Sequence, residues 1–171
     1  MPSSSVSSAR LVRSGGARAA LAAAVVVPLV VAAAPTASAA TPTQLEQSVV
    51  ALVNRERAKV RCSALRVDAR LAKAAKLHST DMAVHNYFSH TSRDGRTPWT
   101  RIRAQGYRYG SAENIAAGQT TASEVVAAWM HSPGHRKNIL NCSNKAIGVG
   151  VARVLKASRY GVYWTQDFGR R

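Results

Sequence analysis

Histidine and carboxylate side chains are the groups in this chain of 171 residues that could move protons or bind a metal ion. Four of the eight acidic residues lie where a helix cap or a turn is expected, namely Glu46, Asp68, Asp94 and Glu124. The acids left to partner a histidine are Glu56, Asp81, Glu113 and Asp167. The five histidines are His78, His85, His90, His131 and His135.

Two histidines with an aspartate between them in sequence lie on a single predicted helix. His78, Asp81 and His85 are spaced i, i+3 and i+7, so they share a helix face on which a metal ion could bind. The same face carries Leu71, Ala75 and Met82, which makes it the edge of the core. The pattern therefore favours a buried histidine beside a carboxylate over a metal site.

A second pair, His131 and His135, has the i, i+4 spacing of zinc ligands on a helix. Pro133 lies between them and disfavours a helical Ser132, so the two rings are not expected to share a face. Ser89 and Ser132 lie near histidines but in no Gly-x-Ser-x-Gly motif, which argues against a serine hydrolase. Ser132 is expected to cap a helix instead.

Helices in the first part and strands at the end should position these groups. Caps and apolar stripes predict helices over about residues 43–60, 68–86, 97–106 and 121–130, with a further helical turn from 132. Residues 61–67 should form a connector or a short strand. Alternation of apolar residues over 147–151 and 160–168 predicts two strands that pair as a hairpin. The order of these elements favours an α+β fold.

The N-terminal segment, residues 1–39, has the features of a signal peptide. Three arginines precede an apolar run over 19–34, and Ala37-Ser38-Ala39 is a small-x-small cleavage pattern. We expect cleavage after Ala39 and a single secreted domain over 40–171; an uncleaved N-terminal anchor is the alternative. The apolar run is short for a membrane-spanning helix, which needs about 20 residues.

Cys62 and Cys142 are the only cysteines of the chain. In an oxidising compartment outside the cell they should form one intrachain disulfide, and two free thiols are the alternative. Two cysteines this far apart exclude the structural zinc sites that use closely spaced cysteine pairs.

The chain is strongly basic, with 24 Lys and Arg against 8 Asp and Glu and a formal net charge of +16. Without the three arginines of the leader it keeps +13. Such a charge outside the cell favours anionic wall polymers or phospholipid head groups as partners, and a solvated basic surface without a partner is the alternative. No nucleic-acid-binding motif is present. The basic residues of the second half include Arg101, Arg103, Arg108, Arg136, Lys137, Arg153, Lys156, Arg159, Arg170 and Arg171.

Several short motifs recur in an order that resembles one known family. They cover residues 86–90 (Asn-Tyr-Phe-Ser-His), 112–116 (Ala-Glu-Asn-Ile-Ala), 129–136 (Trp-Met-His-Ser-Pro-Gly-His-Arg) and 163–168 (Tyr-Trp-Thr-Gln-Asp-Phe). Over about residues 44–168 the chain resembles the CAP superfamily of cysteine-rich secretory, antigen 5 and pathogenesis-related proteins, and most of all its bacterial secreted branch. The resemblance implies a three-layer α-β-α sandwich with a central antiparallel sheet.

Many members of this family carry two histidines and two glutamates in a central cleft. The resemblance places the first histidine at His90 and the first glutamate at Glu113. The second glutamate position is Ser132 and the second histidine position is Tyr163, so the family tetrad is incomplete here. His135, in the Pro-Gly-His run typical of the bacterial branch, is a nearby candidate.

Two functional hypotheses follow from these residues. The first is a secreted, non-enzymatic and monomeric protein that requires no cofactor and binds a lipid, a sterol-like molecule or an anionic cell-envelope component near His90, Glu113 and His135. The second is a hydrolase of wall or peptide material that uses zinc or another divalent metal ion on His90 and His135. In a third arrangement, these groups would form a hydrogen-bonded cluster without metal, and their role would be structural.

Overall fold

The computed structural model describes residues 42–154 and 158–171 of the chain. The predicted leader, residues 1–39, lies outside the described residues, and so does the boundary expected at residue 40. Five helices and four strands occupy the described part: α1 (Pro42–Lys59), β1 (Arg66–Val67), α2 (Ala69–Val84), α3 (Pro98–Ala104), β2 (Gly110–Ala117), α4 (Ala122–His131), α5 (Pro133–Ile139), β3 (Ala146–Arg153) and β4 (Val162–Gly169).

The four strands form one sheet in the order β1-β3-β4-β2. β3 pairs with β4 and β4 with β2, both antiparallel, whereas the two-residue β1 runs parallel to β3. The predicted hairpin of β3 and β4 is confirmed, and residues 61–67 do contain a short strand. β2, which the sequence pattern did not predict, forms one edge of the sheet.

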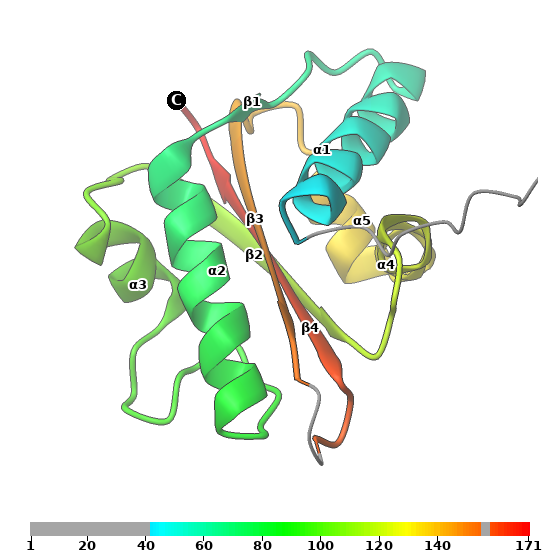
Figure 1. Cartoon of the computed structure of the whole chain (residues 1–171). Helices are drawn as coiled ribbons and strands as arrows, with labels where there is room; N and C mark the ends of the chain where they lie inside the picture. The colour runs from blue at the N-terminus through cyan, green and yellow to red at the C-terminus, as the bar shows by residue number, and fades with distance from the viewer. Residues whose placement is uncertain (1–41, 155–157) are drawn as a thin grey trace, which may run out of the picture. The chain divides into compact units, whose positions relative to one another are not determined.

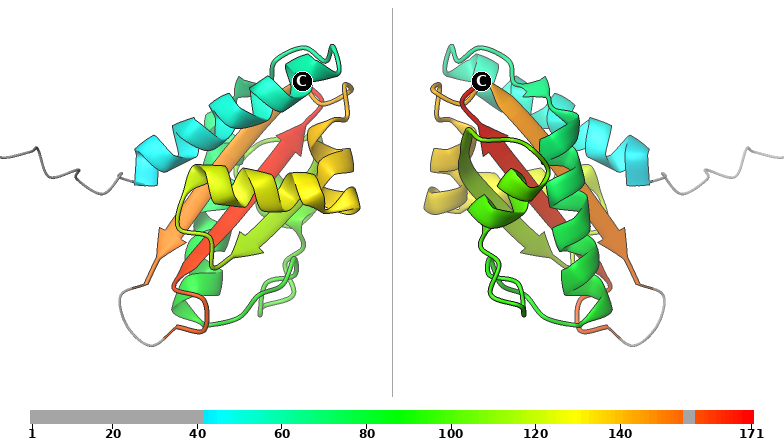
Figure 2. Two further views of the ribbon diagram at one scale, coloured as in Figure 1. Left: turned by 90° about the vertical axis from the view of Figure 1, so that its right-hand side faces the viewer. Right: turned by 90° about the vertical axis from the view of Figure 1, so that its left-hand side faces the viewer.

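Helices cover both faces of the sheet, which confirms the three-layer α+β architecture. Figure 1 shows α2 and α3 on one side and α1, α4 and α5 on the other. The two views of Figure 2 show α4 crossing one face and α2 running along the other. The larger core lies under α1 and α4, and it includes Val49, Val53, Trp129, Trp164 and Phe168.

On the opposite face α2 packs very close to the middle of the sheet. A Cβ atom added at Gly148 would lie 2.1 Å from the backbone carbon of Leu71, and one at Gly150 would lie 2.2 Å from the backbone nitrogen of Lys76. Only glycine at these two β3 positions lets the helix backbone approach the strand this closely.

The predicted helix caps have mixed outcomes. Asp68 accepts a hydrogen bond from the backbone N–H of Arg70, and Thr121 and Glu124 form the predicted capping box. The capping role predicted for Glu46 is wrong, because α1 already begins at Pro42. Its Oε1 instead accepts a hydrogen bond of 3.1 Å from the backbone N–H of Val151, so Glu46 ties α1 to β3.

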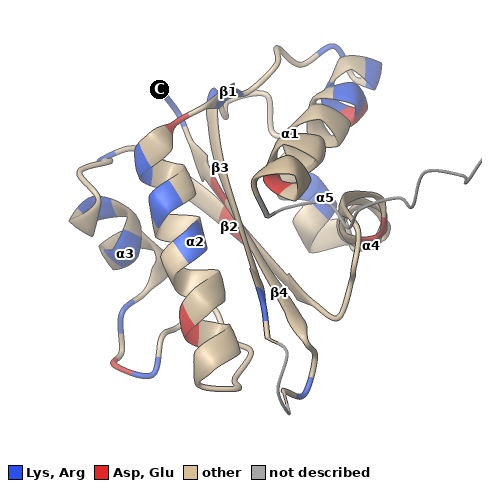
Figure 3. Ribbon diagram, in the orientation of Figure 1, with Lys and Arg blue, Asp and Glu red and all other residues tan. Residues whose placement is uncertain are grey.

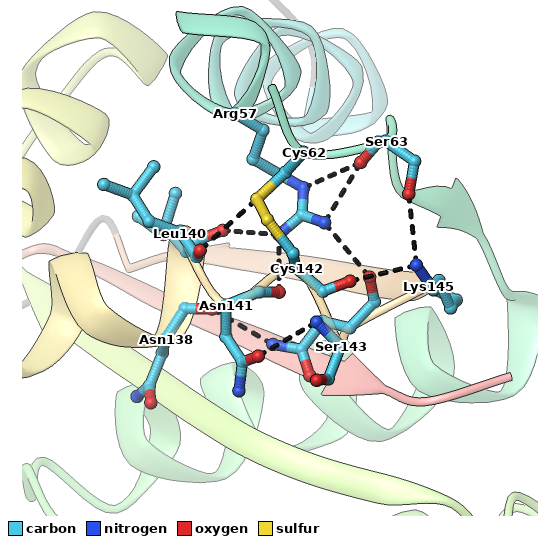
Figure 4. The surroundings of a disulfide bond; sticks show 11 residues. Arg57, Cys62, Ser63, Asn138, Leu140, Asn141, Cys142, Ser143 and Lys145 are labelled. Carbon is cyan, nitrogen blue, oxygen red and sulfur yellow. Dashed lines mark hydrogen bonds between the residues drawn. A yellow bond between two sulfur atoms is a disulfide. The ribbon is translucent and has the colours of Figure 1, made fainter. Parts of the chain in front are cut away.

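The predicted disulfide between Cys62 and Cys142 is present, with the two Cα atoms 5.0 Å apart. Beside it lies Arg57, a fully buried residue of α1 (Figure 4). Its guanidinium donates hydrogen bonds to four backbone carbonyls, those of Ser63, Ile139, Asn141 and Asn144. Burial lowers the pKa of Arg57. Arginine and disulfide together fasten the end of α1 to the segment between α5 and β3.

Candidate functional site

Glu113 lies in the edge strand β2, on the face of the sheet that packs against α2. It is directly opposite Asp167 of β4 in the register of the two strands. Side chains alternate between the faces of a strand, so Asp167 shares its face with Thr165, whose hydroxyl accepts a 2.8 Å hydrogen bond from Ser79 of α2. The sheet register therefore brings two buried carboxyl groups side by side beneath α2 and α3.

Both carboxyl oxygens of Glu113 have strong partners. His90 Nδ1 is 2.7 Å from Oε1, and Arg101 Nη2 is 2.6 Å from Oε2. A carboxylate can only accept, so Nδ1 of His90 carries the proton and Nε2 has the lone pair when the ring is neutral. The side chain of Glu113 is 2% exposed and that of His90 is 51% exposed. A buried carboxylate thus fixes the tautomer of a solvent-accessible imidazole.

Arg101 of α3 stabilises the His90–Glu113 pair through further hydrogen bonds. Its Nη1 donates to the backbone carbonyls of His90 at 2.8 Å and Arg96 at 2.9 Å, and to the hydroxyl of Ser92 at 3.2 Å. The sequence analysis counted Arg101 among the surface charges, and this is wrong, because its side chain is only 5% exposed. Arg101 holds the loop that carries His90 as well as the carboxylate that orients it.

His135 lies in α5, whose first turn packs against the edge strand β2. Its backbone carbonyl accepts a 3.2 Å hydrogen bond from Asn114 Nδ2, which fixes the start of α5 against β2. Burial lowers the pKa of His135, and the nearby charge of His90 lowers it further. The structure therefore joins His90 to Glu113 by a hydrogen bond and places the backbone of His135 against Asn114, the next residue of β2.

Comparison with known proteins decides the family. The model of the cysteine-rich secretory protein family (CAP) matches residues 50–168. The chain belongs to the CAP family. It is 42% identical over 134 residues to YkwD, an uncharacterized protein of Bacillus subtilis strain 168, an alignment that covers 78% of this chain and 50% of YkwD.

Solved structures agree with this assignment. An extracellular protein of Bacillus anthracis containing an SCP domain superposes with a TM-score of 0.66 at 30% identity, covering 79% of this chain and 45% of that one. An outer surface protein of Borrelia burgdorferi, with a TM-score of 0.65 at 24% identity over 73% of this chain and 91% of its own, shares the fold. The CAP chain thus spans about half the length of YkwD and of the B. anthracis protein.

Ser132 and Tyr163 are the other two residues predicted for the CAP cleft. Ser132 is the N-cap residue of α5, but its side chain makes no capping hydrogen bond. Tyr163 is fully buried, and its hydroxyl is 3.2 Å from Asn86 Oδ1 and 3.1 Å from Ser158 Oγ. It lies four residues from Asp167 along β4, roughly 13 Å away. Tyr163 therefore belongs to the opposite end of the sheet.

Asp167 is a member of the cluster that the sequence analysis left unassigned. Burial raises the pKa of Asp167 well above its usual range, and the adjacent charge of Glu113 raises it further. The alternation over 160–168 was a signal for the strand, but it marks the even-numbered residues as the apolar face, whereas β4 is buried on both faces. The partner strand β2, which shows what Asp167 faces, carried no such signal.

The three-residue group on α2 does not act as one site. His78 is buried and its Nε2 is 3.0 Å from the carbonyl oxygen of Ser89, as a buried histidine should be. His85 Nδ1 instead contacts Asp81 Oδ1 at 2.8 Å, and the hydroxyl of Tyr87 donates to the other oxygen of Asp81. Over residues 42–154 and 158–171, no three His, Cys, Asp or Glu side chains are placed to hold a metal ion together.

His78 should make the stability of the CAP domain depend on pH. Burial lowers the pKa of His78 to about 4, and the charge of Arg101 contributes. Between pH 6.5 and 4 the unfolded chain binds a proton at this residue that the folded chain excludes. Stability from His78 is therefore complete above pH 6.5 and is lost as the pH falls toward 4, by at most about 3 kcal/mol.

Urea unfolding of the wild type and of His78→Gln at pH 7.0, 5.5 and 4.5 measures this effect. The glutamine can still donate to the Ser89 carbonyl but does not titrate, so the difference between the two proteins isolates His78. We expect the wild type to lose more stability than the variant as the pH falls. Parallel losses in the two proteins would contradict the assignment.

Proposed function

We propose that this CAP domain is a secreted, non-enzymatic binding protein for a lipid-type amphiphile with an acidic end. The observation that carries the proposal is the exposed imidazole of His90, held by a hydrogen bond to the buried Glu113, with the start of α5 and its His135 fixed against the neighbouring Asn114. Groups fixed in advance by buried partners lose little conformational entropy when a ligand binds. Such preorganisation suits a binding site.

The helix that carries His135 also borders space for an apolar group. A hollow of about 370 Å³ lies at the junction of α4 and α5. Met130, Pro133 and Leu140 give it apolar walls, and Arg136 and Lys137 line it with positive charge. Apolar walls with a few fixed polar groups are the usual composition of a small-molecule site. We infer that the acyl part of the ligand occupies this hollow and that its acidic end lies among the cations of α5 and the imidazoles of His90 and His135.

Location outside the cell is supported by the relatives and by the disulfide. The B. anthracis relative is described as an extracellular protein and the B. burgdorferi one as an outer surface protein. In the part of the chain that the structure describes, no helix is long and apolar enough to cross a membrane. The Cys62–Cys142 bridge is of the kind that persists in oxidising compartments.

The zinc-dependent hydrolase is the second functional hypothesis, and the donor set fits it less well. His90 Nε2 and a neutral His135 are suitable nitrogen ligands, but Glu113 already uses both oxygens on His90 and Arg101. Catalytic zinc sites ordinarily have three protein ligands, and no third one joins these two within the described residues. The hydroxyl of Ser89 accepts a hydrogen bond from the backbone N–H of Thr91, and that of Ser92 accepts one from Arg101 of α3.

Isothermal titration with decanoate tests the proposal. We expect saturable binding of decanoate and none of decyltrimethylammonium, which has the same tail and the opposite charge. The double variant His90→Ala/His135→Ala should weaken binding roughly tenfold, since it removes hydrogen bonds to a charged group. Arg55→Ala, which removes an exposed cation of α1, is the matched control and should leave affinity unchanged. Equal affinities in all three proteins would contradict the proposal.

A further inference from the structure

A second surface of the molecule combines exposed aromatic rings with arginines. Trp99 of α3 is 40% exposed and Tyr109, just before β2, is 44% exposed. A small hollow of about 100 Å³ is lined by Trp99, Arg103 and Arg108. The C-terminal residue Arg171 stacks on Tyr109, its guanidinium carbon 4.3 Å from the ring centroid. We call these residues the α3 patch: Trp99, Arg103, Arg108, Tyr109 and Arg171.

The rings of the α3 patch are held in place by the fold. A Cβ atom added at Gly110 would lie 3.5 Å from Trp99 Cε3, so the indole packs against the start of β2. Arg171 Nη1 donates to the hydroxyl of Tyr109 at 3.2 Å, and the ring of Tyr107 meets that of Tyr109 edge-on at 6.2 Å. Large aromatic side chains left exposed on a rigid support are typical of recognition surfaces.

The charge of the patch has one sign. Arg103 and Arg108 are exposed, and neither forms an ion pair within the described residues. No acidic residue occurs between Asp94 and Glu113, and Asp94 is already paired with Arg96. Figure 3 shows the basic residues of α3 with no acidic residue on that helix. The charged side chains of the α3 patch are therefore all positive.

We propose that the α3 patch binds an acidic polysaccharide. The indole face of Trp99 stacks on the apolar face of a sugar ring, and Arg103 and Arg108 pair with the carboxylates that the sugars carry. Arginine is suited to this role because its planar guanidinium pairs with a carboxylate through two parallel hydrogen bonds. A polysaccharide is favoured over a nucleic acid because relatives of this chain are described as extracellular and outer surface proteins.

The α3 patch shares no residue with the ligand site proposed above, and only the buried Arg101 of α3 contacts the loop that carries His90. α3 covers the face of the sheet that α2 covers, whereas the hollow with the cationic rim lies at α4 and α5 on the other face (Figure 1). Variants of the α3 patch that lose polysaccharide binding should therefore keep decanoate binding, and variants that lose decanoate binding should keep polysaccharide binding. Failure of one proposal can be told from failure of the other.

Tryptophan fluorescence provides a direct probe of the patch. Trp99 is the exposed one of the three tryptophans, since Trp129 and Trp164 are 1% and 0% exposed. Titration with hexagalacturonate at 50 mM NaCl should change the emission of Trp99 saturably, whereas the neutral hexamer maltohexaose should not. Trp99→Ala, followed by calorimetry, should weaken hexagalacturonate binding about tenfold.

The arginines are tested by salt and by a matched charge control. Arg103→Ala/Arg108→Ala should weaken binding about tenfold at 50 mM NaCl and reduce its dependence on salt, because fewer charges are screened. Arg55→Ala/Arg61→Ala removes the same charge from exposed positions elsewhere and should change the affinity less than twofold. An equal loss in this control would show non-specific attraction to the net charge and overturn the proposal. Tighter binding of a single-stranded hexanucleotide than of hexagalacturonate would also overturn it.

Discussion

Replacing Glu113 by alanine is expected to lower the free energy of unfolding by about 4 kcal/mol, the cost of leaving a buried charge without its partner. The charge is that of Arg101, whose side chain is 5% exposed and whose Nη2 lies 2.6 Å from the lost carboxylate. Its remaining partners are two backbone carbonyls and a hydroxyl, none of which carries a negative charge. Urea unfolding at pH 7 measures the loss.

Two further variants separate charge from packing at this position. Glu113→Gln keeps an acceptor for Arg101, so it should lose about half as much stability. The double variant Arg101→Met/Glu113→Ala removes both charges. Its loss of stability should be smaller than the sum of the losses in the single variants Arg101→Met and Glu113→Ala, and a double-mutant cycle measures this difference. A loss below about 1 kcal/mol in Glu113→Ala would show that water or the neighbouring Asp167 carboxylate compensates for the missing charge, contrary to the expected loss.

Removing the disulfide should have an effect of similar size. Cys62 and Cys142 are 80 residues apart, and a cross-link over that length restricts the unfolded chain by about 4 kcal/mol in the loop-entropy model. The double variant Cys62→Ser/Cys142→Ser avoids a leftover thiol and should melt roughly 12 °C lower than the wild type. Arg57, which fastens the same junction through backbone carbonyls, should keep the variant folded at 25 °C.

The control for the disulfide uses reducing agent. Dithiothreitol should lower the melting temperature of the wild type to that of the double variant and leave the variant unchanged. A melting temperature that is the same in the wild type and the variant under non-reducing conditions would contradict a stabilising bridge.

The helices and the hairpin were predictable because their signals are local. Asp68 and Thr121 cap helices within their own turn, and the alternation over 160–168 marks a strand without reference to any partner. β2 was missed for the opposite reason. It is an Ala-rich strand that buries Glu113 and Asn114, and their partners Arg101 and Gln166 come from elsewhere in the chain. Its residues show no alternation and have weak strand propensity.

The site itself was only partly predictable. His90, Glu113 and His135 were selected by resemblance to the CAP superfamily, since separations of more than 20 residues carry no geometric information by themselves. Arg101 was overlooked because an arginine in a strongly basic chain is most simply explained as a surface charge. Its burial depends on α3 packing across the loop that carries His90, which no local pattern encodes.

The central proposal is that His90 and His135 bind the same ligand, whose acyl part occupies the hollow at the junction of α4 and α5. The most direct test follows the imidazole proton resonances of all five histidines by NMR during a decanoate titration. We predict that His90, His135 and His131, which lines the hollow, shift together with a single dissociation constant, while His78 and His85 do not move. A shift of His131 alone, or no saturable shift of His90 and His135, would contradict the claim.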